Sequence, residues 1–496
     1  MRRVPLLSGS RIVLVPVGDD DVLLRPPSPP EQVVDVAAAV RDALRFPLSG
    51  PPLDSLVTRR GRATVLVEPA ALPLPGAPQD ARKSAIAVAI EELERCGVPD
   101  ERQTILLAGG LGRRFGQRDL ERLLPPPQAR GFRGRVVVHD VEDEALVPVG
   151  PARARIHPDL VDTDLVLAVT AAETVLHGGP GALVAACDAA TMRGTAAADS
   201  LLEAAGSPAW RLGLELEEAV AARAALAGVS LVLDLPRLTG TFRGYPDDPA
   251  AVARVTRSPL RTAFSLLPDA LRKDVLGSQG RRMEATGAFA GPPSVAHAEA
   301  LLRGIALRGT RLDEPVDALV VGVPWIGPHV PRESLNPITV AAIALGLALR
   351  LRRDAFPIRP GGSLILIHPL TRSFAHGTQV PYSTMFNALR TAQERDELAD
   401  VERAAAADER ALAAYRAGTA CHPLLPYADW AGCAPALSRL GRVIVGGCRD
   451  AVAARALGFV PSHGIGSALE MAHGVAGGNA RLGVLLAPPY APLLVG

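Results

Sequence analysis

Residues 105–124 constrain the fold of this chain more strongly than any other stretch. They read ILLAGGLGRRFGQRDLERLL, in which a short apolar run is followed by a glycine-rich turn, two arginines and a helical pattern. This succession is typical of a buried parallel strand that ends in a loop and continues into a helix. Leu120, Leu123 and Leu124 have the i, i+3, i+4 spacing of one buried helix face. The stretch therefore predicts an open α/β sheet whose carboxyl edge meets this loop.

The same loop is a candidate ligand site. Glycines let backbone N–H groups approach a ligand, and the start of the following helix favours an anion. Two arginines at a helix start place positive charge beside the positive end of the helix dipole, and a bound anion would offset this unfavourable interaction. We therefore select Gly110, Gly112, Arg113 and Arg114 as candidate anion- or substrate-binding residues. The alternative is an ordinary strand–helix turn with solvated arginines, because glycine-rich loops are weak motifs.

Other apolar runs alternate with helical patterns along the chain. This alternation predicts βαβ units and mostly parallel sheets. Because 496 residues exceed one ordinary domain, we predict two α/β domains with a cleft between them. Their predicted boundaries are 1–265 and 266–482, followed by a terminal strand at 483–496. The expected strands are residues 11–17, 61–67, 105–108, 134–138, 164–170, 230–235, 316–322, 362–368, 442–445 and 483–487.

Composition narrows the classes of function. A formal net charge of +1 argues against a nucleic-acid or membrane-surface protein. The apolar stretch 338–351 is shorter than a membrane span and is closed by arginines, so we expect a buried helix. Five scattered cysteines without CxxC spacing, and no convincing signal peptide, predict a cytoplasmic protein without a zinc site. No pair of histidines has the helical spacing of metal ligands, so no metal site is predicted.

Several polar residues follow expected strands. His139 and Asp140 come after residues 134–138, but neighbours on a strand point to opposite faces, so both a catalytic and a structural role stay open. Glu173 and His177 follow residues 164–170, and the imidazole of His177 either faces the cleft or belongs to the turn. We take these four residues as catalytic candidates.

The second domain supplies substrate-binding candidates. His329, Arg332 and Asn336 follow the strand at 316–322, and His368 and His376 follow the strand at 362–368. Both turns are expected to face the first domain across the cleft.

Taken together, these blocks resemble the nickel-dependent lactate racemases, which carry a nickel-pincer nucleotide. Residues 105–124 resemble the family's strand–GTHR–helix block, and VVVHDVEDEAL at 136–146 resembles its NHD block. Residues 164–190 resemble the block with a histidine, a glycine pair and the cofactor-bearing lysine, and 316–337 and 359–378 resemble the main strands of its second domain. The resemblance implies two α/β domains, a last strand that returns to the first domain, and racemisation or epimerisation of 2-hydroxy acids by hydride transfer.

The departures from the family fall on its chemistry. Leu72 stands where the family's substrate-gripping arginine belongs, and Gly112 stands in place of the GTHR histidine. Glu173 takes the position of another histidine, with His177 close by in an ambiguous alignment. The position of the cofactor-bearing lysine falls on Leu183 or Gly181. The chain's only lysines, Lys83 and Lys273, lie outside that block, and arginine cannot replace an amine nucleophile.

These losses argue against the family reaction. Hydride-transfer racemisation needs a base on the hydroxyl and a cation that grips the carboxylate, and leucine supplies neither. We therefore predict that the chain does not racemise lactate in the family's way. Two readings remain beside that one: a diverged enzyme that uses Arg113, His139 and His177, or a non-catalytic homologue that binds a nucleotide, a small acid or a protein partner. Polar residues that converge on the cleft favour the enzyme, and an apolar cleft favours the homologue.

Overall fold

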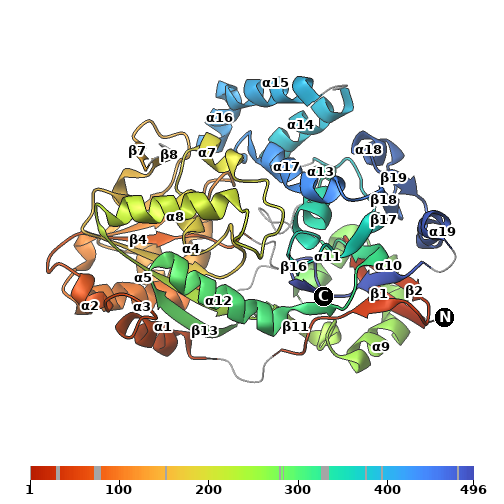
Figure 1. Ribbon diagram of the computed structural model, residues 1–496, viewed down its shortest axis with the longest axis horizontal. Helices are drawn as coiled ribbons and strands as arrows, with labels where there is room; N and C mark the ends of the chain where they lie inside the picture. Colours follow the sequence, from red (N-terminus) through yellow and green to blue (C-terminus); the bar gives the residue numbers. More distant parts are fainter. Residues whose placement is uncertain are drawn as a thin grey trace.

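The computed structural model describes residues 2–29, 34–71, 80–150, 154–278, 281–282, 284–325, 335–374, 377–391, 395–477 and 480–496. Two six-stranded sheets, each flanked by helices, occupy the left and right halves of Figure 1. Within the described ranges, no helix is both long and apolar enough to cross a bilayer. The predicted α/β class with mostly parallel sheets is confirmed.

The first sheet has the order β13-β10-β9-β4-β5-β6, in which only the β10–β13 pair is antiparallel. Alternating side chains face two separate cores, as parallel strands require. Val65 packs with helices α1 (Val36–Arg45) and α3 (Ala81–Arg95), and Leu66 packs with α6 (Gly181–Val184) and α8 (Pro208–Ala221). The strands are β4 (Ala63–Val67), β5 (Gln103–Leu107), β6 (Arg135–Val138), β9 (Leu165–Ala171), β10 (Ala225–Leu233) and β13 (Ala285–Gly291).

The second sheet has the order β19-β18-β17-β15-β20-β3 and is parallel throughout. One face packs against α13 (Pro337–Ala341), α14 (Val380–Thr391) and α17 (Leu425–Leu437). The other face packs against α9 (Pro249–Arg257), α19 (Ile465–Ala476) and the hairpin β1 (Arg2–Ser8)–β2 (Arg11–Val17). The strands are β3 (Val22–Leu24), β15 (Val316–Gly322), β17 (Ile358–Ile367), β18 (Arg442–Gly446), β19 (Val460–Ser462) and β20 (Leu482–Leu485).

The chain crosses from the second sheet to the first after β3, and it returns to the second sheet in the middle of the sequence, between β10 and β15. Residues 2–24 lie with the second sheet, because the β1–β2 hairpin packs on one of its faces and β3 pairs with β20. Conversely, β13 completes the first sheet, and α12 (Pro293–Arg308) packs against β10. The predicted boundaries at residues 265 and 482 stay predictions.

The end of the chain differs from the expectation that residues 483–496 return to the first domain. β20 lies between β15 and β3 in the second sheet. β21 (Leu493–Val495) pairs with β14 (Thr310–Leu312) and β16 (Arg352–Asp354). All four residues of β20 are buried, as in a parallel sheet whose two faces are both covered. An apolar sequence of this kind does not specify which of the two sheets the strand joins.

The expected helix at 338–351 forms as α13 followed by a π-helix, Ala342–Ala348. Two helices follow one another over residues 395–416, and the Asp408 carboxylate caps the second by accepting hydrogen bonds from the N–H groups of Arg410 and Ala411. These two are α15 (Arg395–Ala406) and α16 (Glu409–Arg416). The remaining α-helices are α2 (Leu53–Leu56), α4 (Gln117–Leu123), α5 (Pro126–Arg130), α7 (Ala189–Gly194), α10 (Leu260–Leu266), α11 (Asp269–Ser278) and α18 (Ala451–Ala456).

Candidate functional site

A cavity of about 530 Å³ opens at the carboxyl ends of β4, β5 and β9. This is the edge at which parallel sheets bind ligands. The opposite wall comes from α13, the π-helix and α17, so the cavity lies between the two halves of the molecule. On the first wall it is lined by residues that include Glu68, Gly110, Gly112, Arg113, Thr174, His177 and Met192, and on the second by Thr339, Gly346, Arg350, Leu425, Asp429 and Gly432.

The glycine loop that follows β5 forms part of the first wall. Gly110 has a φ of 58°, in the left-handed region that favours glycine, and a Cβ there would lie 2.6 Å from Cε of Met192. Gly110, Gly112 and Arg113 all line the cavity, as the sequence predicted for this loop. The guanidinium of Arg113 is already paired, since its Nη2 lies 2.7 Å from Oδ2 of Asp119. The same carboxylate accepts a hydrogen bond from the N–H of Gly116 at the start of α4, where a bound anion was expected.

Arg114 does not line the cavity. Its guanidinium donates hydrogen bonds to the carbonyl oxygens of Val138 and Arg416, at 3.2 and 3.1 Å, and lies 3.5 Å from the carboxylate of Asp140. Asp140 also lies 4.0 Å from Arg416 of α16. Arg114 and Asp140 therefore link the two halves of the molecule instead of facing the cavity.

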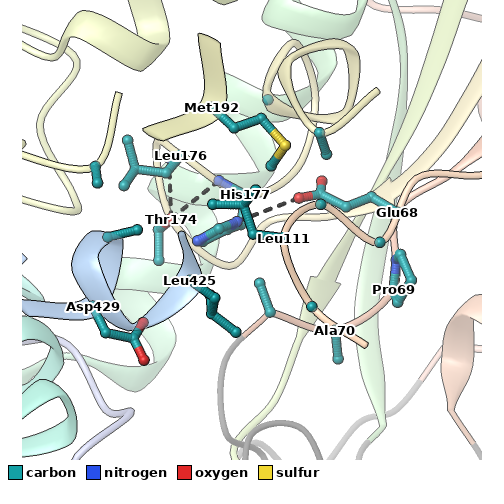
Figure 2. A pocket seen from close by; sticks show the side chains of 18 of the residues that line it. Glu68, Pro69, Ala70, Leu111, Thr174, Leu176, His177, Met192, Leu425 and Asp429 are labelled. Carbon is teal, nitrogen blue, oxygen red and sulfur yellow. Dashed lines mark hydrogen bonds and ion pairs between the residues drawn. The ribbon is translucent and has the colours of Figure 1, made fainter. Parts of the chain in front are cut away.

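The loop after β9 brings a histidine and a carboxylate together at the cavity. Nδ1 of His177 lies 3.4 Å from Oε1 of Glu68, and Oε2 of Glu68 accepts a hydrogen bond of 2.6 Å from the N–H of Gly178. The hydroxyl of Thr174 accepts a hydrogen bond from the N–H of His177 at 3.1 Å. Figure 2 shows the imidazole and the carboxylate facing each other, near Leu111 and Met192. The side chain of His177 is 40% exposed, so a ligand can reach its ring.

Comparisons with known proteins agree with this architecture. Residues 9–169 match the family model of the lactate racemase N-terminal domain. Over these residues, about a third of the chain, the sequence is similar to that domain. The structure of the lactate racemase apoprotein from Thermoanaerobacterium thermosaccharolyticum is similar, with a TM-score of 0.64 and 13% sequence identity over 99% of this chain and 100% of that chain. A protein structure from Thermotoga maritima has a TM-score of 0.50 and 10% identity over 94% of this chain and 100% of that chain. A search of curated proteins found no match.

Glu173 forms a buried ion pair. Its Oε1 pairs with the guanidinium of Arg82, and its Oε2 accepts a hydrogen bond from the N–H of Ala71. Burial alone would lower the pKa of Arg82, but the carboxylates of Asp80 and Glu173 raise it above its ordinary value. Glu173 does not line the cavity and is therefore not placed there as a base.

Three other predicted residues have structural contacts and do not line the cavity. His139 is buried with Nε2 2.9 Å from the carbonyl oxygen of Cys187, and burial lowers its pKa to about 4. Nδ1 of His368 accepts a hydrogen bond from the N–H of Leu370, and burial lowers the pKa of His368 to about 3. Asn336 caps α13 by accepting a hydrogen bond from the N–H of Thr339. The positions of His329, Arg332, His376 and Leu72 lie outside the described residues.

The sequence analysis missed Glu68, Asp429 and Arg350. Asp429 stands on the second wall, where the hydroxyl of Tyr382 donates a 2.6 Å hydrogen bond to its carboxylate and burial raises its pKa to about 6. The available signal was a single acidic residue in the apolar sequence of α17. Arg350 is one of the arginines that close the apolar stretch 338–351, and Glu68 directly follows the strand expected at 61–67.

The described residues do not fit a covalently held nickel-pincer nucleotide. The family's lysine falls on Leu183 or Gly181 by resemblance. Leu183 is 0% exposed in the core around α6 and does not line the cavity, and Gly181 lines the cavity but has no side chain, since a Cβ there would lie 2.3 Å from the carbonyl oxygen of Leu176. Nζ of Lys83 donates to the carbonyl oxygen of Glu121, and Lys273 pairs with Asp269, so neither amine faces the cavity. The described part of the chain also holds no group of three histidine, cysteine or acidic side chains placed to bind a metal ion.

Replacing Glu173 with Gln should destabilise the protein by about 3 kcal/mol, because it removes one partner of a buried ion pair and leaves Arg82 undercompensated. Urea unfolding at neutral pH measures the change. Glu91→Gln is the matched control, since Glu91 is exposed on α3 and pairs with Arg41 at 3.6 Å; its effect should stay within about 0.5 kcal/mol. Equal stability of Glu173→Gln and the wild type would contradict the ion pair's structural role.

His368 should make stability depend on pH. Its pKa is about 3 in the folded chain and 6.5 when unfolded, so below 6.5 the unfolded state binds the additional proton. The free energy of unfolding therefore falls as the pH drops from 6.5 towards 3, by at most about 1.4 kcal/mol per pH unit for this group. His368→Asn, whose Oδ1 can replace Nδ1 as an acceptor, should lose this component in urea titrations at several pH values. A stability difference between wild type and variant that is constant with pH would refute the prediction, and the exposed His463→Asn serves as control.

Proposed function

We propose that this lactate-racemase-like protein binds a small organic acid in the cavity and transfers a proton through His177 and Glu68, in place of hydride transfer to a nickel-pincer nucleotide. The observation that carries the proposal is the pairing of His177 with Glu68 at the cavity wall. His177 is the one histidine among the described residues that line this cavity.

The dyad has the arrangement of an oriented general base. Glu68 is fixed by the N–H of Gly178, and it can accept the proton of Nδ1 in a hydrogen bond. Nε2 is then the basic nitrogen, and the carboxylate stabilises the imidazolium that forms when Nε2 takes a proton. Apolar side chains nearby, among them Leu111, Met192 and Leu425, reduce competition from water. These features support removal of a proton from the carbon next to the carboxylate of a small acid.

The proposal departs from the chemistry that the family resemblance suggests. A nickel-pincer nucleotide would be attached through a lysine, and the two residues that the resemblance places there are Leu183, an apolar core residue, and Gly181, which has no side chain. We also propose that the ligand is a carboxylate or a nucleotide, that the protein has no nucleic-acid or membrane partner, and that it is cytoplasmic.

A non-catalytic binding protein is the second candidate. It is favoured by the pairing of several charged groups on the first wall within the protein itself, Arg113 with Asp119 and Asp80 with Arg82. When the charged groups of this wall are paired within the protein, the wall can bind a ligand but offers it no reactive group.

Proton exchange in D₂O tests the catalytic proposal. The purified protein is incubated with a panel of 2-hydroxy acids, and deuterium incorporation at the carbon next to the carboxylate is followed by NMR. We expect His177→Gln to slow exchange by about 100-fold or more, and Glu68→Gln to slow it less, because general bases contribute about this much. His463→Gln, on the exposed surface, should leave exchange unchanged. Acids that raise the melting temperature without any exchange would support the binding protein instead.

A second test addresses the cofactor. When the chain is co-expressed with a pathway that makes the nickel-pincer nucleotide, we expect native mass spectrometry to show the mass of the polypeptide alone. The reason is the apolar side chain of Leu183 and the engagement of both lysines elsewhere. An added cofactor mass with stoichiometric nickel would overturn this expectation and restore the hydride mechanism.

A further inference from the structure

Arg350 is a buried cation at the wall of the cavity. It follows the π-helix Ala342–Ala348 and is 4% exposed. Its guanidinium is held by backbone oxygens from three separate segments. Nε donates to Ala198 at 2.6 Å, Nη1 donates to Gly346 at 3.2 Å and to Gly432 at 3.0 Å, and Nη2 donates to Ala196 at 3.1 Å.

The positive charge of Arg350 lacks a close counterion in the described part of the chain, where no carboxylate lies within ion-pair distance of it. Arg352, two residues later and equally buried, instead has its Nη2 2.8 Å from the carboxylate of Asp199. Burial lowers the pKa of Arg350 to about 10, so it stays protonated at neutral pH. A buried charge is costly unless an opposite charge joins it.

The surroundings of Arg350 leave room for that opposite charge. A guanidinium has five N–H donors, and the four hydrogen bonds to backbone oxygens leave one donor on Nη2. Gly346 and Gly432 line the cavity beside it and have no side chains to cover it. A Cβ on Gly432 would lie 2.7 Å from Nη1, so glycine at this position keeps the guanidinium in place.

We infer that Arg350 is the anion anchor of the cavity and binds the carboxylate of a small organic acid. This inference rests on the proposed function and adds the residue that recognises the acid. Of the other arginines that line the cavity, Arg113 is paired with Asp119 and Arg122 is exposed at the surface. The acid's carboxylate therefore lies against the second wall, and the rest of the molecule extends towards the first.

Calorimetric titration with benzoate and lactate, and with the neutral amides of both acids, tests the inference. The wild type should bind at least one of the two carboxylates and bind its amide far more weakly. Arg350→Met should weaken carboxylate binding about 30-fold, because it removes a charged hydrogen bond. Gly432→Ala retains the charge but displaces Nη1, and it should also weaken binding. Arg303→Met, on the exposed face of α12, is the control that should retain the affinity, and Arg122→Met tests the other arginine of the cavity that could bind the acid.

Melting temperatures with and without each acid, compared for each variant separately, remove differences in intrinsic stability. If Arg350→Met does not fold, the affinity of Gly432→Ala for the carboxylates tests the inference. No binding of either carboxylate by the wild type, unchanged affinity in the Arg350 and Gly432 variants, or loss of affinity in Arg122→Met would overturn the inference.

The outcomes also separate this inference from the proposed catalysis. Binding that depends on Arg350, without deuterium exchange, supports the anchor and refutes the proton transfer. Deuterium exchange that depends on His177, together with binding that does not depend on Arg350, supports the proton transfer and refutes the anchor.

Discussion

The buried ion pair between Arg82 and Glu173 organises the carboxyl edge of the first sheet. It ties α3 to the loop after β9, and Asp80 and the N–H of Ala71 join the same cluster. Because this cluster holds Glu173 in the interior, the loop turns at Thr174 and delivers His177 to the cavity. His297 of α12 contacts the same turn, because its Nε2 lies 2.9 Å from the carbonyl oxygen of Thr174. The position of the candidate base thus depends on a charge pair that does not itself line the cavity.

A second set of contacts fixes the two walls of the cavity relative to each other. His422, in the segment before α17, is fully buried, and its Nε2 lies 3.1 Å from the carboxylate of Glu142. Its backbone N–H donates to the carbonyl oxygen of Leu111 in the glycine loop. Arg114 and Asp140 reinforce this junction through Arg416. Since Arg350 also binds carbonyl oxygens from both halves, a ligand at this site would meet walls whose separation is already set.

The sequence predicted strands better than it predicted their neighbours. The strands expected at 105–108 and 316–322 form as β5 (Gln103–Leu107) and β15 (Val316–Gly322), because a buried parallel strand is apolar on both faces and its sequence shows this. The same property makes residues 483–487 uninformative about their sheet, and β20 joined the second one. Side-chain direction was a further limit: His139 and His177 both follow strands, yet only His177 lines the cavity. Arg350 was beyond sequence reasoning, because its significance comes from three distant segments whose carbonyl oxygens surround it.

Leu183, one of the two positions at which the resemblance places the cofactor-bearing lysine, is part of the packed core of this protein. Leu183 lies in the same core as Leu66, Leu106 and Val166, on the face of the first sheet covered by α6 and α8. A lysine at this position would have to bury an amine without a partner or displace α6 from the sheet, and either change is costly. A single substitution therefore does not restore the cofactor's attachment. The apolar core beneath the cavity therefore agrees with the proposal that the chemistry is carried by the protein's own side chains.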